Sequence, residues 1–213
     1  MKISKLVLAS AALCASLAAN AQVAGSLGGG FGTFLQLSST GLSGGTVATL
    51  SGGTVYTADQ PFADIPSGVV FGGDFLAAGP TSGTTATLNF TGGGVDYISF
   101  LWGSPDLYNV LTVTSTGGFT QTFTAGVSSA APTATSLNFS VTNGNQGFSQ
   151  YVQFAGLLGS KITSLSFTNA PAQDAFESAN YSITTPVPEP ETYALLLAGL
   201  GAVGFVASRR RKD

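Results

Sequence analysis

The segment Thr85-Ala86-Thr87-Leu88-Asn89-Phe90 alternates strictly between polar and apolar side chains. A period of two places successive side chains on opposite faces of an extended strand, so that one face is buried and the other is solvated. Similar alternation recurs in the segments at 107–113, 119–124, 136–142, 148–154 and 181–183. Because Thr, Val, Phe and Tyr fit a pleated surface, the pattern predicts half-buried antiparallel strands.

Glycine- and asparagine-rich turn signals separate these segments, at 52–53, 72–74, 92–94, 117–118 and 143–145. Gly117-Gly118, between two clear strand patterns, predicts a two-residue hairpin. The strand patterns recur about every ten residues, and no stretch of the central region has a helical period. The sequence therefore predicts an all-β domain over 22–185, an antiparallel β-sandwich with a jelly-roll-like arrangement.

The composition excludes several classes of function. Charged residues make up 8% of the 213-residue chain, against a typical ~25%, and histidine is absent. From 22 to 185 there is one lysine against seven carboxylates, a formal charge of −6, so a nucleic-acid partner is excluded. Without His, neither a Cys/His zinc site nor a standard catalytic triad can form. We therefore predict no cofactor, no metal site and no enzyme activity.

The N-terminus has the three parts of a secretory signal peptide. Lys2 and Lys5 precede an apolar run at 6–19, and Ala19 and Ala21 form an A-x-A cleavage site. We predict a signal peptide at 1–21, with export through the Sec translocon and removal by signal peptidase. Cleavage removes the only cysteine, Cys14, so no disulfide supports the mature chain. A retained membrane anchor is the alternative, although the run is shorter than the ~20 residues of a spanning helix.

The C-terminus, 186–213, has three parts as well. The motif Val187-Pro188-Glu189-Pro190 is followed by an apolar run at about 193–207 and then by the cationic block Arg209, Arg210, Arg211 and Lys212. Four of the seven Lys and Arg residues lie in this block, which predicts a single transmembrane helix with its basic end in the cytoplasm. At 1.5 Å per residue the helix is roughly 22 Å long, short for a ~30 Å hydrocarbon core. A short anchor suits a temporary membrane segment that is later removed.

This tail resembles the PEP-CTERM sorting signal of Gram-negative bacteria. The resemblance implies that a membrane protease, exosortase, cuts at or near Pro188-Glu189-Pro190 and that these residues are recognised by that partner. It further implies a protein held transiently in the inner membrane and then released to the cell surface or the extracellular matrix, in species that make exopolysaccharide. The alternative is an ordinary C-terminal anchor behind a proline-rich linker.

The segment at 97–109 holds the only tryptophan and is the densest in aromatic and polar side chains. It resembles an F-x-W-G-S-x-D-x-Y-N-x-L run of exosortase-dependent surface proteins, which implies a β-sandwich and a surface location. Two interpretations stay open. Trp102 and Tyr108 could stack on a sugar while Asp106 and Asn109 bond its hydroxyls, or Trp102 and Tyr108 belong to the core beside a tight turn at 104–106.

A second polar stretch, 174–181, precedes the last predicted strand. Its Asp174, Glu177 and Asn180 could offer oxygen ligands to Ca²⁺, but a solvated strand edge is the simpler interpretation. The main hypothesis is a structural surface or matrix protein associated with exopolysaccharide or biofilm. A carbohydrate-binding module using the Trp102 region is the alternative. A glycan hydrolase is the least favoured function, since no spacing of the carboxylates singles out a catalytic pair.

Overall fold

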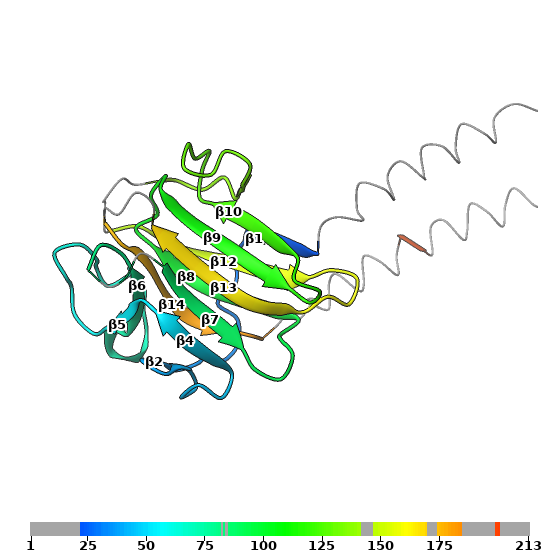
Figure 1. The fold of residues 1–213 in the computed structure, drawn as a ribbon, viewed down its shortest axis with the longest axis horizontal. Coiled ribbons are helices and arrows are strands. Elements are labelled where there is room, and N and C mark those ends of the chain that lie inside the picture. Colours follow the sequence, from blue (N-terminus) through cyan, green and yellow to red (C-terminus); the bar gives the residue numbers. More distant parts are fainter. Residues whose placement is uncertain are drawn as a thin grey trace, which may run out of the picture.

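The computed structural model describes residues 22–81, 83, 85–141, 147–169, 174–184 and 199–200. Within these residues the strands form two β-sheets that pack face to face around a shared hydrophobic core (Figure 1). The predicted all-β sandwich is confirmed. The alternating side chains of 85–90 bury Ala86, Leu88 and Phe90 in that core, as their period of two requires.

The first sheet, in the described part of the chain, has the spatial order β1-β12-β8-β14-β6-β5, and every neighbouring pair is antiparallel. In that order the strands are β1 (Val23–Leu27), β12 (Ser149–Gly156), β8 (Tyr97–Gly103), β14 (Phe176–Ser182), β6 (Phe75–Ala78) and β5 (Thr54–Tyr56). A short 3-10 turn, η1 (Phe71–Gly73), precedes β6.

The second sheet has the order β11-β10-β9-β13-β7-β4-β3-β2 in the same described residues. Its pairs are antiparallel except for β10 and β11, which run parallel over two residues. In that order the strands are β11 (Thr135–Ser136), β10 (Thr120–Thr124), β9 (Asn109–Ser115), β13 (Ile162–Asn169), β7 (Thr85–Phe90), β4 (Ala48–Gly52), β3 (Gly41–Leu42) and β2 (Leu37–Ser38).

The central strands follow the order of a jelly roll. One sheet contains β6-β14-β8-β12 and the other β7-β13-β9-β10, so the chain changes sheet at each step from β6 to β9 and again from β12 to β14. The last strand, β14, lies between β6 and β8. This interleaving of early and late strands is the double Greek key of jelly-roll domains. As a result, loops that are distant in the sequence lie beside each other at each end of the sandwich.

Aromatic side chains from both sheets fill the core. Phe100 of β8 packs edge-on against Phe167 of β13, with ring centroids 5.4 Å apart, and it also contacts Phe154 and Tyr181. Burying one such side chain contributes roughly 1.5–3 kcal/mol. Since the predicted mature chain has no cysteine, this packing is its main source of stability.

A smaller cluster covers the outer face of the first sheet. The segment at 57–73 crosses this face, and Ala63 packs there with Phe75, Ala77, Ala175 and Ala179. The segment is held by Asn180, whose backbone has a positive φ of 50° at a β-bulge in β14. The first sheet is therefore buried on both faces where this segment crosses it, which explains why every residue of β14 is buried.

Two local predictions need correction. The alternation at 136–142 predicts a strand, but among its described residues only Ser136 is in one, the short β11. Leu137 and Phe139 are still buried, although the segment leaves the sheet at Asn138, which has a positive φ of 57°. The Gly117-Gly118 hairpin is present between β9 and β10, but its loop has three residues, because the Ser115 amide donates to the Phe119 carbonyl (2.8 Å).

Candidate functional site

Trp102, the aromatic residue proposed to contact a sugar, points into the core from β8. Its exposed fraction is 0%, and its ring stacks on Phe176 at 4.3 Å and meets Phe139 edge-on at 5.4 Å. A sugar platform needs an exposed aromatic face. The geometry therefore favours the alternative in which Trp102 is a core residue.

The other three candidates of that segment come together in one turn between β8 and β9. Asn109 accepts a hydrogen bond from the Asp106 amide through Oδ1 (2.9 Å) and donates its own amide to the Asp106 carbonyl (3.1 Å). Both side chains are fully buried. Burial raises the pKa of Tyr108, and its hydrogen bond to Asp106 raises it further. The predicted tight turn is thus present, displaced to 106–109, and its polar groups bond one another.

The solvated strand edge expected at 174–181 is wrong for β14, which is buried along its length and carries a buried carboxyl group near this turn. Glu177 is 2% exposed and lies on the outer face of the first sheet, opposite Gly103 of β8. Burial raises the pKa of Glu177 well above its ordinary value, and the nearby Asp106 carboxylate adds to the effect. The backbone amide of Asp64 hydrogen-bonds this carboxyl group. Burial without a cationic partner among the described residues therefore favours the neutral form of Glu177 over its charged form.

Because Gly103 has no side chain, the segment at 57–73 packs closely against β8 beside Glu177. A Cβ at this position would lie 2.7 Å from Pro66 Cγ and 3.1 Å from Glu177 Cβ. Asn180 fixes the same segment, because its Oδ1 accepts from the Val70 amide (2.9 Å) and its Nδ2 donates to the Gly68 carbonyl (2.9 Å) and to the Tyr151 hydroxyl (2.8 Å). From the sequence Asn180 is a possible calcium ligand, but both polar atoms of its side chain form these internal hydrogen bonds.

The carboxyl groups of this end differ in their exposure. Burial raises the pKa of Asp64, with smaller contributions from Asp59 and Asp174. Among the described residues, no three His, Cys, Asp or Glu side chains are placed to hold a metal ion. A glycosidase needs two carboxyl groups that face a sugar-sized space. Glu177 and Asp106 are instead enclosed, so they act on the stability of the domain.

The opposite end of the first sheet carries shallow hollows around Tyr97. One, of about 340 Å³, lies along β1, β8 and β12 and includes Asp96 and Gln153, and a neighbouring one of about 230 Å³ includes Ile183. The Tyr97 hydroxyl donates to Gln153 Oε1 (2.9 Å), and Tyr97 itself is almost fully buried. These hollows offer no exposed aromatic face.

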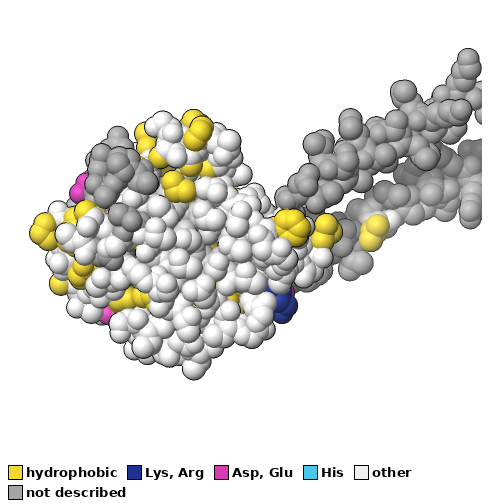
Figure 2. Space-filling model, viewed as in Figure 1, with side chains coloured by type: hydrophobic (Ala, Val, Ile, Leu, Met, Phe, Trp, Pro, Cys, Tyr) yellow, Lys and Arg dark blue, Asp and Glu magenta, His cyan; other side chains and the backbone are white. Residues whose placement is uncertain are grey.

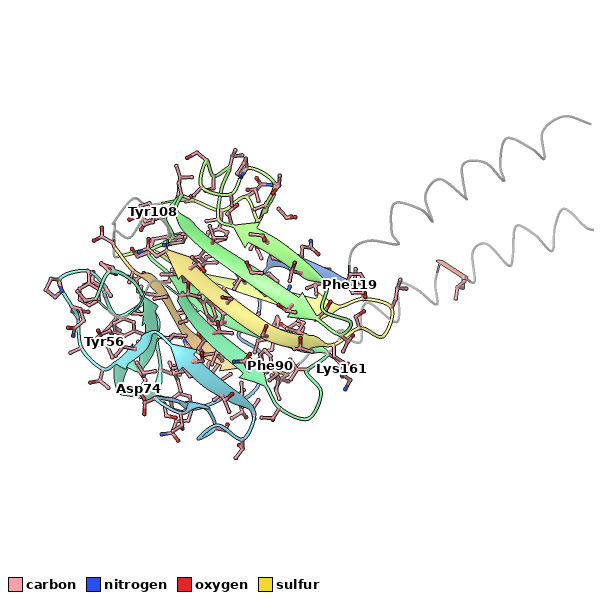
Figure 3. All side chains as sticks on the ribbon, viewed as in Figure 1. Tyr56, Asp74, Phe90, Tyr108, Phe119 and Lys161 are labelled. Carbon is pink, nitrogen blue, oxygen red and sulfur yellow. The ribbon has the colours of Figure 1, made fainter. Side chains whose placement is uncertain are left out.

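The surface is mostly uncharged. Figure 2 shows a face made largely of backbone and uncharged polar side chains, with carboxylates near one end and a basic side chain at the other. The basic residue at that end is Lys161 (Figure 3), which lies 3.9 Å from Asp96 in the salt bridge found within the described residues. Both partners are exposed, so the pair contributes little stability.

The predicted sorting and cleavage residues lie outside the described part of the chain. This applies to Ala19 and Ala21, to Val187-Pro188-Glu189-Pro190 and to Arg209, Arg210, Arg211 and Lys212. The predicted span at 193–207 is described only at Gly199 and Leu200. Over the residues that the structure does describe, no helix has the length and hydropathy needed to cross a bilayer.

Comparison with known proteins bears on the tail alone. No match was found among curated proteins or among solved structures. Residues 186–212 match the family described as the PEP-CTERM protein-sorting motif, which is the segment and the family that the tail resembles. The motif implies an exported, membrane-associated surface protein that is targeted to exosortase. The chain therefore carries a PEP-CTERM protein-sorting motif at its C-terminal end, behind a β-sandwich domain.

Proposed function

We propose that this chain is an exported structural protein of the cell surface or extracellular matrix, released by exosortase processing and associated with exopolysaccharide. The sorting motif at 186–212 is the observation that carries the proposal. Signal peptidase and the Sec translocon serve its export. The tail then holds the domain at the inner membrane until the cut at or near Pro188-Glu189-Pro190.

The β-sandwich supports a structural role. Its core is closed, with Trp102 and Phe100 fully buried, and the turn after β8 is closed by the hydrogen bond from the Asp106 amide to Asn109 Oδ1. Its surface is rich in Ser, Thr, Asn and Gln and has a low charge density, which suits contact with a hydrated polysaccharide without ionic attraction. The carbohydrate-binding alternative loses its main argument with the burial of Trp102, and the hydrolase alternative loses Glu177 and Asp106, whose carboxyl groups are enclosed.

The processing claim is tested by the intact mass of the surface-associated protein in a host with and without its exosortase. We expect a mature chain that starts at Gln22 and lacks Arg209 to Lys212, and a tail-bearing membrane precursor when exosortase is absent. Glu189→Ala should cause the same accumulation. Glu191→Ala, which removes the neighbouring acid outside Pro-Glu-Pro, is the matched control and should be processed normally.

Recovery of a tail-bearing chain from the culture medium of exosortase-positive cells would contradict the processing claim. The matrix role is tested separately, by sedimentation of the processed protein with the polysaccharide of the host. A protein that stays in the supernatant at every polysaccharide concentration would remove that part of the proposal.

A further inference from the structure

We propose that the end of the sandwich from which the tail departs docks on the lipid bilayer, with the loop tips at Phe119 and Leu158 in the headgroup region. The contact forms while the sorting tail holds the chain in the membrane, so the inference rests on the proposed function. It would orient the domain and keep the Pro-Glu-Pro motif near the membrane surface.

Three separate segments build this end. The β9–β10 loop and the β12–β13 loop lie side by side, because the Thr116 amide donates to the Lys161 carbonyl (2.9 Å). The β12–β13 loop also contacts the start of the described chain, where the Leu157 amide donates to the Gln22 carbonyl (2.9 Å). Ile183 borders a hollow together with Tyr97. It lies near the end of 174–184, the last described stretch before the tail. Figure 3 shows Phe119 and Lys161 together at this end.

Large apolar side chains project from these tips. Leu158 is 87% exposed and Phe119 is 56% exposed. Leu158 also has a positive φ of 54°, a conformation that a leucine rarely adopts. A strained backbone that holds an apolar side chain in water indicates a function for that side chain. Insertion of Leu and Phe at the level of the lipid headgroups removes this apolar area from water.

The distribution of charge favours the same orientation. The docking end carries Lys161 and Asp96, which compensate each other. The partly or fully exposed carboxylates Asp59, Asp64 and Asp174 lie near one another at the far end, as their mutual electrostatic effects require. A bilayer with anionic lipids repels the acidic end and accepts the neutral end with its exposed lysine.

The length of the tether sets which end can reach the membrane. Eight residues, 185–192, separate Thr184 from the apolar run. In an extended proline-rich conformation they span at most ~25 Å, at about 3.1 Å per residue. The far end, with the exposed Val127 and Leu107, is further away by the length of β8, about 23 Å at ~3.3 Å per residue. The near end is therefore the one that meets the bilayer.

The test uses the full chain, purified with its tail and reconstituted in vesicles of phosphatidylethanolamine and phosphatidylglycerol. Cys14→Ser removes the only cysteine, so Leu158→Cys provides a unique site for an environment-sensitive fluorophore. Val127→Cys is the matched control, because Val127 is 86% exposed at the opposite end. The emission of the buried Trp102 reports that both variants are folded.

We expect the label at 158 to shift to shorter wavelength and to be quenched by spin-labelled lipid, while the label at 127 does neither. Phe119→Ser should reduce the quenching at 158, whereas Leu107→Ser, in the β8–β9 turn at the far end, should not. Equal spectra and equal quenching at 158 and 127, in protein that floats with the vesicles, would overturn the docking inference alone. A shift at 158 that follows protein density and is insensitive to the lipid quencher would assign the surface to a second copy of the chain and overturn it as well. Failure of the protein to float would instead refute the membrane anchor, and the proposed function with it.

Discussion

Replacing Trp102 by alanine distinguishes a core residue from a sugar platform, because the two roles predict different changes in stability. The side chain is 0% exposed, and its ring stacks on Phe176 at 4.3 Å. Truncation of such a buried ring costs about 3–5 kcal/mol of the free energy of unfolding. The indole Nε1 has no hydrogen-bond partner among the described residues, so the loss comes from packing. Trp102→Phe keeps a ring in the cavity and should cost less.

The free energy of unfolding is measured by urea denaturation of a chain that runs from Gln22 to Thr184. Far-UV circular dichroism follows unfolding, because the variant lacks the only tryptophan. With a urea dependence of about 2 kcal/mol per molar, the expected loss lowers the midpoint by about 2 M. Phe119→Ala, at an exposed aromatic residue, is the control and should change stability by no more than about 0.5 kcal/mol.

An unchanged midpoint for Trp102→Ala, with an unchanged slope, would refute the assignment of Trp102 to the core. Loss of polysaccharide binding without loss of stability would restore the sugar-platform interpretation. A folded Trp102→Ala variant that keeps both its stability and its polysaccharide binding would also refute the reasoning, because removal of a buried ring must lower the free energy of unfolding.

Three further substitutions test the far end of the sandwich. Burial raises the pKa of Glu177 above its ordinary value of 4.5. The contribution of Glu177 to the stability of the native chain should therefore be largest below pH 4.5 and should fall as the pH rises. Glu177→Gln should reduce this fall, measured as the difference between the urea midpoints at pH 5 and pH 8. Asn180→Ala removes three hydrogen bonds and should cost about 3 kcal/mol, with faster hydrogen exchange of the Val70 amide. Gly103→Ala places a Cβ 2.7 Å from Pro66 Cγ and should cost about 1–3 kcal/mol in the same urea assay.

Each of these expectations has a contradicting result. A native chain whose urea midpoint is higher at pH 8 than at pH 5, by an amount that Glu177→Gln removes, would reverse the sign of the Glu177 effect. Unchanged exchange at Val70 in Asn180→Ala would show that Asn180 does not hold the crossing segment. Gly126→Ala, where the new Cβ meets only ordinary contacts at 3.5 Å, is the control for Gly103→Ala and should be neutral; equal effects of the two would contradict the steric argument.

Local patterns along the chain were enough to predict the all-β class and the sorting motif of the tail. Alternation of polar and apolar side chains is a local property, and in the segment at 85–90 it specifies which side chains face the core without reference to any partner strand. The sorting motif at 186–212 is likewise contiguous, so its recognition needs no tertiary contact. The strand prediction at 136–142 was wrong because the positive φ of Asn138 interrupts the extended backbone, although Leu137 and Phe139 stay buried and bond the chain at the end of β10.

The environment of the chemically suggestive residues depends on contacts between distant parts of the chain. Trp102 and Asp106 lie four positions apart in a segment suited to either a core or a sugar site, and the position of β8 between β12 and β14 encloses both. Glu177 becomes a buried acid with a raised pKa because a segment more than one hundred residues earlier crosses over it. Phe119 and Leu158 become one surface through the pairing of β9 with β13. Burial and proximity of this kind depend on contacts between residues distant in sequence, which no local pattern encodes.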